Sequence, residues 1–161
     1  MFKRFFTGTV GLILTALTLC AQPNAATPEQ IAAGKAAYMT ICIACHQPTG
    51  AGLPTVFPSL IKSEYVNGSA ERLVAMVLKG IMPPFKYNGV VYTQLMIAQE
   101  AVLTDDKIAS ILTYVRASFE NNAPPVSAEF VMAVRKKFVE RKTPWIEADL
   151  TTWKDESSLS K

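Results

Sequence analysis

The sequence predicts an all-α fold of about four helices joined by long irregular loops. Four segments begin at a residue that can cap a helix and then carry apolar side chains at helical spacing. The segments between them are rich in proline and glycine, and none alternates clearly enough to predict a strand. The length of 161 residues fits a single domain, so a second large domain is not expected.

The composition excludes several classes of protein. The chain has 16 Lys and Arg against 13 Asp and Glu, with 50% hydrophobic residues and a mean hydropathy of +0.20. This near balance of charge argues against a nucleic-acid-binding protein, and the hydrophobic content argues against a disordered polar chain. The scarce residues are three cysteines and one histidine. Any metal or redox chemistry must therefore be built from very few ligands.

Residues 1–26 have the composition of an export signal. Lys3 and Arg4 give a positive start, and an apolar run over 10–21 is followed by small residues suited to cleavage. Removal of this segment takes away both basic residues, so the formal charge falls from +3 to +1. We therefore expect a mature chain that is exported to the periplasm.

Two alternatives for this N-terminal segment remain open. One is an uncleaved membrane anchor, although the apolar run is shorter than the about 20 residues that span a bilayer. The other is a lipoprotein site at Cys20, although Leu19 is larger than the residue that usually precedes such a cysteine.

The first helix is predicted from Thr27 to about Cys45. Thr27 can cap it, Pro28 suits the first helical position, and Gln30 stands where a capping-box partner belongs. Several prolines and glycines over 46–68 then predict a long irregular loop, and loops of this length in compact domains usually serve a function.

Three more helices follow in the sequence. The second is predicted over 69–79, the third over 104–119, and the fourth from Ser127, while 81–97 is predicted to be irregular. The tail from Thr143 has no firm periodicity. The chain is thus expected to divide into the signal at 1–26, a core domain at 27–126, and a C-terminal helix and tail at 127–161.

The segment Cys42-Ile43-Ala44-Cys45-His46 is the C-x-x-C-H pattern of covalent haem attachment. The two thiols add to the two vinyl groups of a haem, and the adjacent histidine is then placed to ligate the iron. Thioether bonds hold the cofactor irreversibly, which suits an exported protein. We therefore predict one haem c, attached through Cys42 and Cys45 and ligated by His46.

Three other interpretations of these residues are weaker. A zinc site needs about four ligands, and the predicted mature chain offers only three from cysteine and histidine. A thioredoxin-like dithiol needs a preceding strand in a βαβ unit, whereas a capped helix is predicted here. The third is a plain structural disulfide between the two cysteines, which an oxidising compartment would favour.

The chain resembles a class I c-type cytochrome from about Thr27 to Arg135. Besides the haem motif, it has the family's Gly34 and Tyr38 in the first helix and a last core helix that contains Tyr114. The resemblance implies the class I cytochrome c fold, wrapped around one haem by the domain at 27–126. In that family the first and last core helices cross closely, and the glycine permits the approach.

The resemblance also extends to the loop after the motif, which contains Phe57-Pro58-Ser59-Leu60. It implies that the carbonyl of Pro58 orients His46 and that Leu60 packs on the haem face. More narrowly, residues 112–121 are similar to the cytochrome domains of membrane dehydrogenase cytochrome subunits. Those domains usually have Trp-Gly-Asn where this chain has Phe119-Glu120-Asn121.

A single histidine excludes a bis-histidine haem built from the chain's own residues, so a methionine is expected as the second axial ligand. The resemblance favours Met96, shortly before the last core helix, although relatives commonly have proline after that methionine and this chain has Ile97. Met82-Pro83-Pro84 has that local pattern, and an open sixth position is a third possibility. The other methionines of the mature chain are expected to pack in the fold: Met39, Met76 and Met132.

We therefore expect a periplasmic one-electron carrier that cycles between Fe(III) and Fe(II), rather than an enzyme. Its expected partners are a redox donor and acceptor, such as a dehydrogenase or a terminal oxidase. The alternatives are an electron-entry subunit of a dehydrogenase or oxidase complex, and a haem enzyme or sensor with an open sixth site. Membrane association is expected only through a partner or an uncleaved signal, and no nucleic acid is expected.

Two sets of residues are candidates for partner docking. Lys62, Lys79 and Lys86 fall in regions that would flank an exposed haem edge, although each also suits an ordinary surface position. The C-terminal region forms either a partner surface or a solvated helix face through Arg135-Lys136-Lys137, Arg141-Lys142, Trp145 and Trp153.

Overall fold

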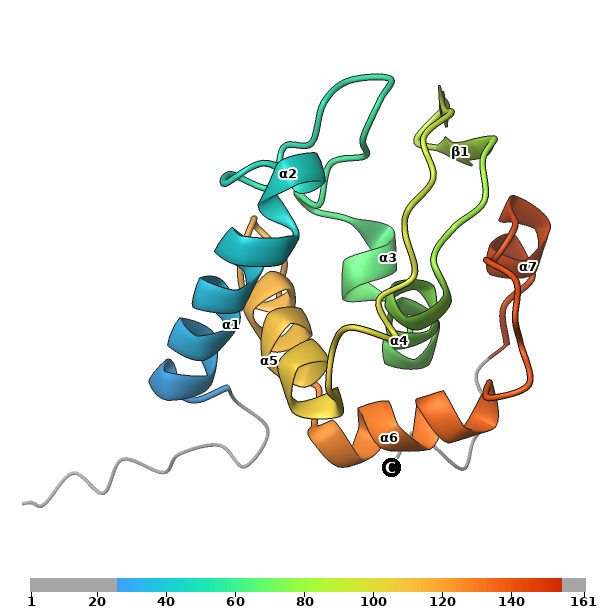
Figure 1. Ribbon diagram of the computed structural model, residues 1–161. Coiled ribbons are helices and arrows are strands. Elements are labelled where there is room, and N and C mark those ends of the chain that lie inside the picture. Colours follow the sequence, from blue (N-terminus) through green and yellow to red (C-terminus); the bar gives the residue numbers. More distant parts are fainter. Residues whose placement is uncertain (1–25, 155–161) are drawn as a thin grey trace, which may run out of the picture.

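The computed structural model describes residues 26–154, so the predicted signal, with Cys20, lies outside the described residues except for its last position. Four helices of ten or more residues form the frame of the described chain (Figure 1). They are α1 (Pro28–Ile41), α4 (Ala70–Lys79), α5 (Asp105–Arg116) and α6 (Ala128–Lys137). The prediction of about four main helices is confirmed. None of the helices between residues 26 and 154 combines the length and apolarity that crossing a bilayer requires.

Each of the four main helices begins where the sequence predicts, because the cap is a local interaction. Thr27 and Gln30 form the reciprocal capping box of α1, with both hydrogen bonds present. The hydroxyls of Ser69, Thr104 and Ser127 accept backbone hydrogen bonds at the starts of α4, α5 and α6.

Helices α1 and α5 cross closely at Gly34, side by side in Figure 1. A Cβ on Gly34 would lie 2.0 Å from the carbonyl oxygen of Ser110 and 2.7 Å from Cβ of Tyr114. No side chain larger than hydrogen fits this crossing. The aromatic ring of Tyr38 lies one turn further along and contacts the rings of Tyr114 and Phe119 at centroid distances of 5.5 and 5.3 Å. The close crossing implied by the resemblance is confirmed.

The structure divides the predicted first helix and adds a short helix to the predicted loop. Cys42 caps the C-terminus of α1, and α2 (Ile43–His46) follows as a separate turn. Within the long loop, Ser63 caps α3 (Glu64–Asn67), since its hydroxyl accepts from the backbone N–H of Val66. Four-residue helices leave too little periodicity for a pattern to predict them.

The expectation that no strand would form was wrong. Strands β1 (Phe85–Tyr87) and β2 (Val90–Tyr92) make an antiparallel hairpin in the segment predicted to be irregular. The turn between them is Asn88-Gly89, with φ angles of 49° and 79°. Asn-Gly between two runs of aromatic and β-branched residues is a strong hairpin pattern, but strands of three residues show no clear periodicity.

The C-terminal region covers the side of the domain formed by α4 and α5. Helix α6 runs across these two helices and leads to the short α7 (Glu147–Thr151), which lies beside the hairpin (Figure 1). The backbone N–H of Lys86 donates to the carboxylate of Glu147 at 2.8 Å. The predicted helix from Ser127 is confirmed, and the tail contains one further turn of helix that its sequence pattern did not predict.

Candidate haem site

A cavity of about 340 Å³ opens between the end of α1, α2, α4, the hairpin and α5. Its size lies within the range of cofactor-binding pockets. The walls are mainly apolar, with side chains from α4, the loops and α5 that include Leu60, Leu73, Val77, Ile81, Ile111 and Leu112. An apolar cavity with a few polar groups is suited to a large, mostly apolar cofactor.

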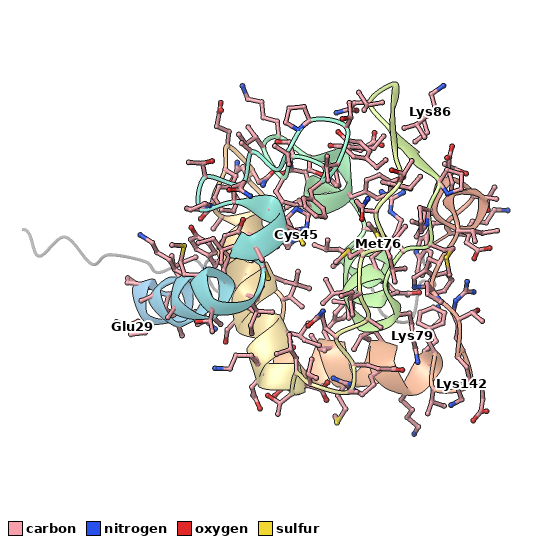
Figure 2. All side chains as sticks on the ribbon, turned by 45° about the horizontal axis from the view of Figure 1, so that its top comes forward. Glu29, Cys45, Met76, Lys79, Lys86 and Lys142 are labelled. Atoms are coloured by element: carbon pink, nitrogen blue, oxygen red, sulfur yellow. The ribbon has the colours of Figure 1, made fainter. Side chains whose placement is uncertain are left out.

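Cys42 and Cys45 both line this cavity and do not form a disulfide with each other. Burial, together with the nearby Cys45, raises the pKa of the Cys42 thiol to about 11. The raised pKa reflects the apolar surroundings of this side chain. Figure 2 shows Cys45 on α2 across from Met76 on α4, and both residues line the cavity.

His46 follows at the end of α2 and lines the same cavity. Its Nδ1 lies 3.1 Å from the carbonyl oxygen of Pro58, which leaves Nε2 as the ring nitrogen for a ligand bond. Burial lowers the pKa of His46, and the hydrogen bond to Pro58 partly opposes this shift. The ring is thus held neutral, the form that can ligate a metal.

Gly52 allows the loop after the motif to fold back onto His46. Its backbone N–H donates to the carbonyl oxygen of His46 at 3.1 Å, and its φ is +66°. A Cβ at this position would lie 2.3 Å from the oxygen of Phe57 and 2.6 Å from that of Pro58. The glycine therefore brings the carbonyl of Pro58 within reach of the imidazole.

Leu60 lies in the cavity wall, in a loop that a buried amide fixes. Asn121 donates from Nδ2 to the carbonyl of Leu60 at 2.9 Å and to that of Val115 at 3.1 Å. Its Oδ1 accepts from the backbone N–H of Ser63 at 3.0 Å and from Nδ2 of Asn67 at 2.7 Å. This side chain connects the end of α5 to the loop before α3 and so supports the wall.

Helix α5, which the sequence predicts over 104–119, ends at Arg116, because the chain turns back after this residue. Phe119 and Glu120 have φ angles of +56° and +59°. Positive φ favours glycine, which is the residue that the resemblance of 112–121 to the dehydrogenase cytochrome domains implies at the position of Glu120. Glu120 in place of glycine therefore strains the backbone at this turn, and it does not alter the cavity, which Glu120 does not line.

The structure separates the two candidate methionines. Met96 lines the cavity together with the cysteines and His46, whereas Met82 is absent from its walls and is 42% exposed. Met76 also lines the cavity, from the buried face of α4. Met39 and Met132 are exposed on helices, at 40% and 56%, so the expectation that they pack in the fold was wrong. Met39 lies on the exposed side of α1 and Met132 on the exposed side of α6.

The hydroxyl of Tyr87 was not predicted as part of the site. It is buried in the cavity wall and has no hydrogen-bond partner among residues 26–154. An unpaired buried hydroxyl is costly, so this atom indicates a polar group of a ligand. A haem carries two carboxylates that can accept such a bond. Recognition of the Asn88-Gly89 hairpin would have placed Tyr87 on the inward face of a strand.

These residues fit a covalently attached haem better than the other candidates. The two cysteines do not form a disulfide, and within residues 26–154 a helix and no strand precedes them. No group of three Cys, His, Asp or Glu residues in that range is placed to hold a metal ion. The cavity instead presents two thiols, one imidazole and the thioethers of Met76 and Met96 among apolar walls.

Comparison with known proteins agrees with this chemistry. Residues 29–115 match the family described as cytochrome c oxidase, cbb3-type, subunit III. The chain belongs to this cytochrome c family. It is therefore an electron-transfer protein that carries covalently bound haem c, and Cys42 and Cys45 stand in the attachment motif.

Individual relatives of this cytochrome come from two groups. Cytochrome c-552 of Thermus thermophilus is 30% identical over 105 residues, which cover 60% of this chain and 79% of the relative. The fructose dehydrogenase cytochrome subunit of Gluconobacter japonicus is 32% identical over 114 residues, or 63% of this chain and 22% of that subunit. The cytochrome c subunit of alcohol dehydrogenase (quinone) from Gluconobacter oxydans is 30% identical over 106 residues, again 22% of its length.

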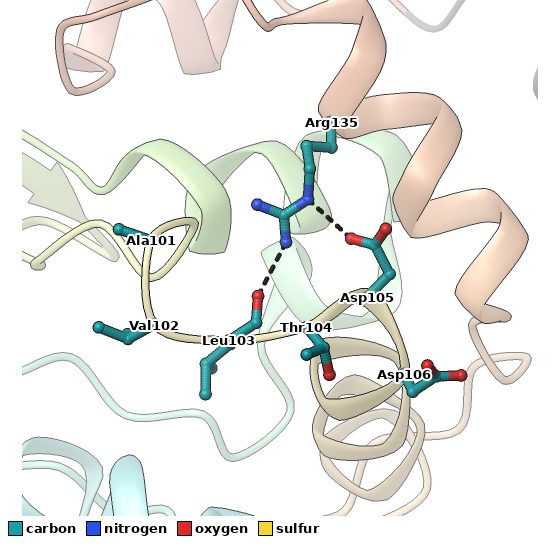
Figure 3. A pocket seen from close by; sticks show the side chains of 7 residues that line it. All are labelled: Ala101, Val102, Leu103, Thr104, Asp105, Asp106 and Arg135. Carbon is teal, nitrogen blue, oxygen red and sulfur yellow. Dashed lines mark hydrogen bonds and ion pairs between the residues drawn. The ribbon is translucent and has the colours of Figure 1, made fainter.

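Several of the basic residues suggested for docking form ion pairs within the cytochrome itself. In the surface depression of Figure 3, Arg135 donates to the carboxylate of Asp105 at 2.7 Å and to the carbonyl of Leu103 at 2.9 Å. Lys137 pairs with Glu71 at 2.6 Å, and Arg141 pairs with Asp149 at 2.6 Å. These three residues of the predicted basic surface instead attach the C-terminal region to the domain or to itself.

The lysines near the cavity also differ in exposure. Lys79 is buried, with an ion pair to Glu100, so its assignment to a docking face was wrong. The last turn of α4 packs against the loop before α5, since the N–H groups of Gln99 and Glu100 donate to the carbonyls of Val77 and Leu78. Lys62 and Lys86 are exposed.

Proposed function

We propose that this cytochrome is an exported, periplasmic one-electron carrier whose haem iron is ligated by His46 and Met96. The observation that carries the proposal is the shared cavity: Met96 lies in the same walls as the two cysteines and His46, whereas Met82 lies outside them. When bound, haem c supplies the one-electron Fe(III)/Fe(II) couple, and a methionine ligand raises its reduction potential.

The surrounding residues would hold the two ligands in position. The carbonyl of Pro58 fixes the tautomer and orientation of His46, and Leu60 would cover one face of the cofactor. Tyr87 would donate to a polar group of the haem. In this proposal residues 27–126 form the haem domain, residues 127–161 form a C-terminal covering segment, and residues 1–26 are removed on export.

A filled sixth position separates an electron carrier from a haem enzyme or sensor. With Met96 in place, no substrate reaches the iron, so cyanide and peroxide should alter the spectrum of the oxidised protein only slowly and at high concentration. A redox titration should show one reversible one-electron wave. Rapid conversion to a high-spin or cyanide-bound spectrum at low ligand concentration would instead support an enzyme or a sensor.

The second candidate is an electron-entry subunit of a dehydrogenase complex. The similarity to the cytochrome subunits of fructose and alcohol dehydrogenases supports this role. Size-exclusion chromatography of the periplasmic fraction and of detergent-solubilised membranes would distinguish the two candidates. A subunit would elute in a stable stoichiometric complex, whereas a free carrier would elute alone and accept electrons in second-order encounters whose rate falls only modestly with salt.

A further inference from the structure

The segment before α7 pairs through its backbone with the chain that follows α4. The N–H of Trp145 donates to the carbonyl of Gly80 at 3.0 Å, and the carbonyl of Trp145 accepts from the N–H of Met82 at 2.7 Å. Trp145 thereby forms a parallel bridge with Ile81. This contact joins residues more than sixty positions apart in the chain.

Ile81 carries the pairing onward to Met96. The N–H of Ile81 donates to the carbonyl of Met96 at 3.0 Å, and the N–H of Met96 donates to the carbonyl of Ile81 at 3.1 Å. Gly80, with a φ of +76°, permits this approach because a Cβ there would collide with the oxygen of Met96. Three extended segments of backbone are thus joined by single bridges, with Ile81 between Trp145 and Met96.

The segment around Trp145 is anchored by the side chain of that residue. The indole is 5% exposed, and its Nε1–H donates to the carbonyl of Ala75 in α4 at 2.8 Å. The guanidinium carbon of Arg141 lies 3.7 Å from the indole ring centroid, and its nitrogens donate to the carbonyls of Thr143 and Pro144. The segment around Trp145 is therefore fixed to α4, the helix that forms one wall of the cavity.

We propose that residues 141–146 are a brace that holds Met96 in the cavity, with Trp145 as its positioning residue. The proposal rests on ligation by Met96, and the brace lies beyond residues 29–115 that match the family. Both backbone hydrogen bonds of Met96 described above go to Ile81, so motion of the 80–82 segment moves the methionine. Weakening of the brace should therefore increase the population in which Met96 has left the sixth coordination position of the iron.

The test measures how easily an added ligand replaces Met96 in the oxidised holoprotein. Imidazole takes the sixth position only when the methionine leaves, so its apparent affinity reports the open population. Trp145→Ala should bind imidazole about tenfold more tightly than wild type, and Arg141→Ala about threefold more tightly. Trp153→Ala removes a side chain of the same size, whose ring lies 5.1 Å from that of Trp145 but outside residues 141–146, and should stay within about twofold of wild type.

Two further measurements separate the possible outcomes. Circular dichroism and thermal unfolding check that each variant is folded, and hydrogen exchange of the Met82 and Met96 amides should accelerate in Trp145→Ala but not in Trp153→Ala. If Trp145→Ala does not fold, Arg141→Ala provides the deciding variant, because the Arg141 side chain is 26% exposed.

The absorption band that thioether coordination gives to oxidised haem distinguishes this proposal from the proposed function. If wild type lacks the band, or Met96→Ala retains it, the ligation and the brace are both overturned. If wild type has the band and Met96→Ala loses it, the ligation stands. In that case, unchanged imidazole affinity in folded Trp145→Ala and Arg141→Ala would overturn the brace alone.

Discussion

Replacement of Gly34 by alanine tests the contact on which the arrangement of α1 and α5 depends. The added Cβ would lie 2.0 Å from the oxygen of Ser110, whereas ordinary van der Waals contact begins at 3.4 Å. The helices must therefore separate by more than about 1 Å, in a region packed as densely as a crystal. Overpacking of this kind destabilises a protein by about 1–3 kcal/mol.

Two smaller effects modify this value. Alanine favours helix over glycine by about 0.5–1 kcal/mol, which offsets part of the loss. Separation of the helices also weakens the ring contacts of Tyr38 with Tyr114 and Phe119, each of which contributes about 0.5–1.5 kcal/mol. We expect a net loss of about 2 kcal/mol in the free energy of unfolding.

Urea unfolding of the oxidised holoprotein, followed by far-ultraviolet circular dichroism, measures this change. Ala33→Gly is the control, because Ala33 is exposed on the same helix and reports only the intrinsic preference, a loss of about 0.5–1 kcal/mol. A Gly34→Ala protein as stable as wild type would refute the reasoning, since it would show that the two helices do not approach as closely as described.

Three other substitutions test the cavity and its support. Tyr87→Phe should lower the stability of the holoprotein by about 1 kcal/mol if the hydroxyl bonds the haem, whereas removal of an unpaired hydroxyl would raise it, as chemical denaturation will show. Asn121→Ala leaves several buried backbone groups unpaired and should cost about 3 kcal/mol in the same assay, and a loss below about 1 kcal/mol would contradict the network. Glu120→Gly should raise the thermal midpoint by a few degrees, because glycine relieves the positive φ, and a lower midpoint would count against that explanation.

The parts of the fold that could be predicted are those determined by neighbouring residues. The caps at Thr27, Ser69 and Thr104 act within one helical turn, so a single sequence shows them. The hairpin also has a local pattern in Asn88-Gly89, but its strands of three residues are too short to show a clear alternation. The break after α1 at Cys42 has no comparable signal.

The site divides in the same way. The spacing of Cys42, Cys45 and His46 is local and is sufficient to predict the attached cofactor. The choice between Met82 and Met96 depends on which residue the folded loop turns inward, and only the resemblance favoured Met96. The pairing of Trp145 with Gly80 is a long-range backbone contact that leaves no periodicity in either segment.

The central claim is that the thioether of Met96 ligates the haem iron, and methyl NMR tests it most directly. In the reduced protein, a methionine methyl held against the haem lies in its ring current and resonates far upfield of the others. With methionine methyl labelling, we predict one such resonance in wild type, Met76→Leu and Met82→Leu, and its loss in Met96→Leu alone. Its persistence in Met96→Leu, or its absence from wild type, would contradict the account.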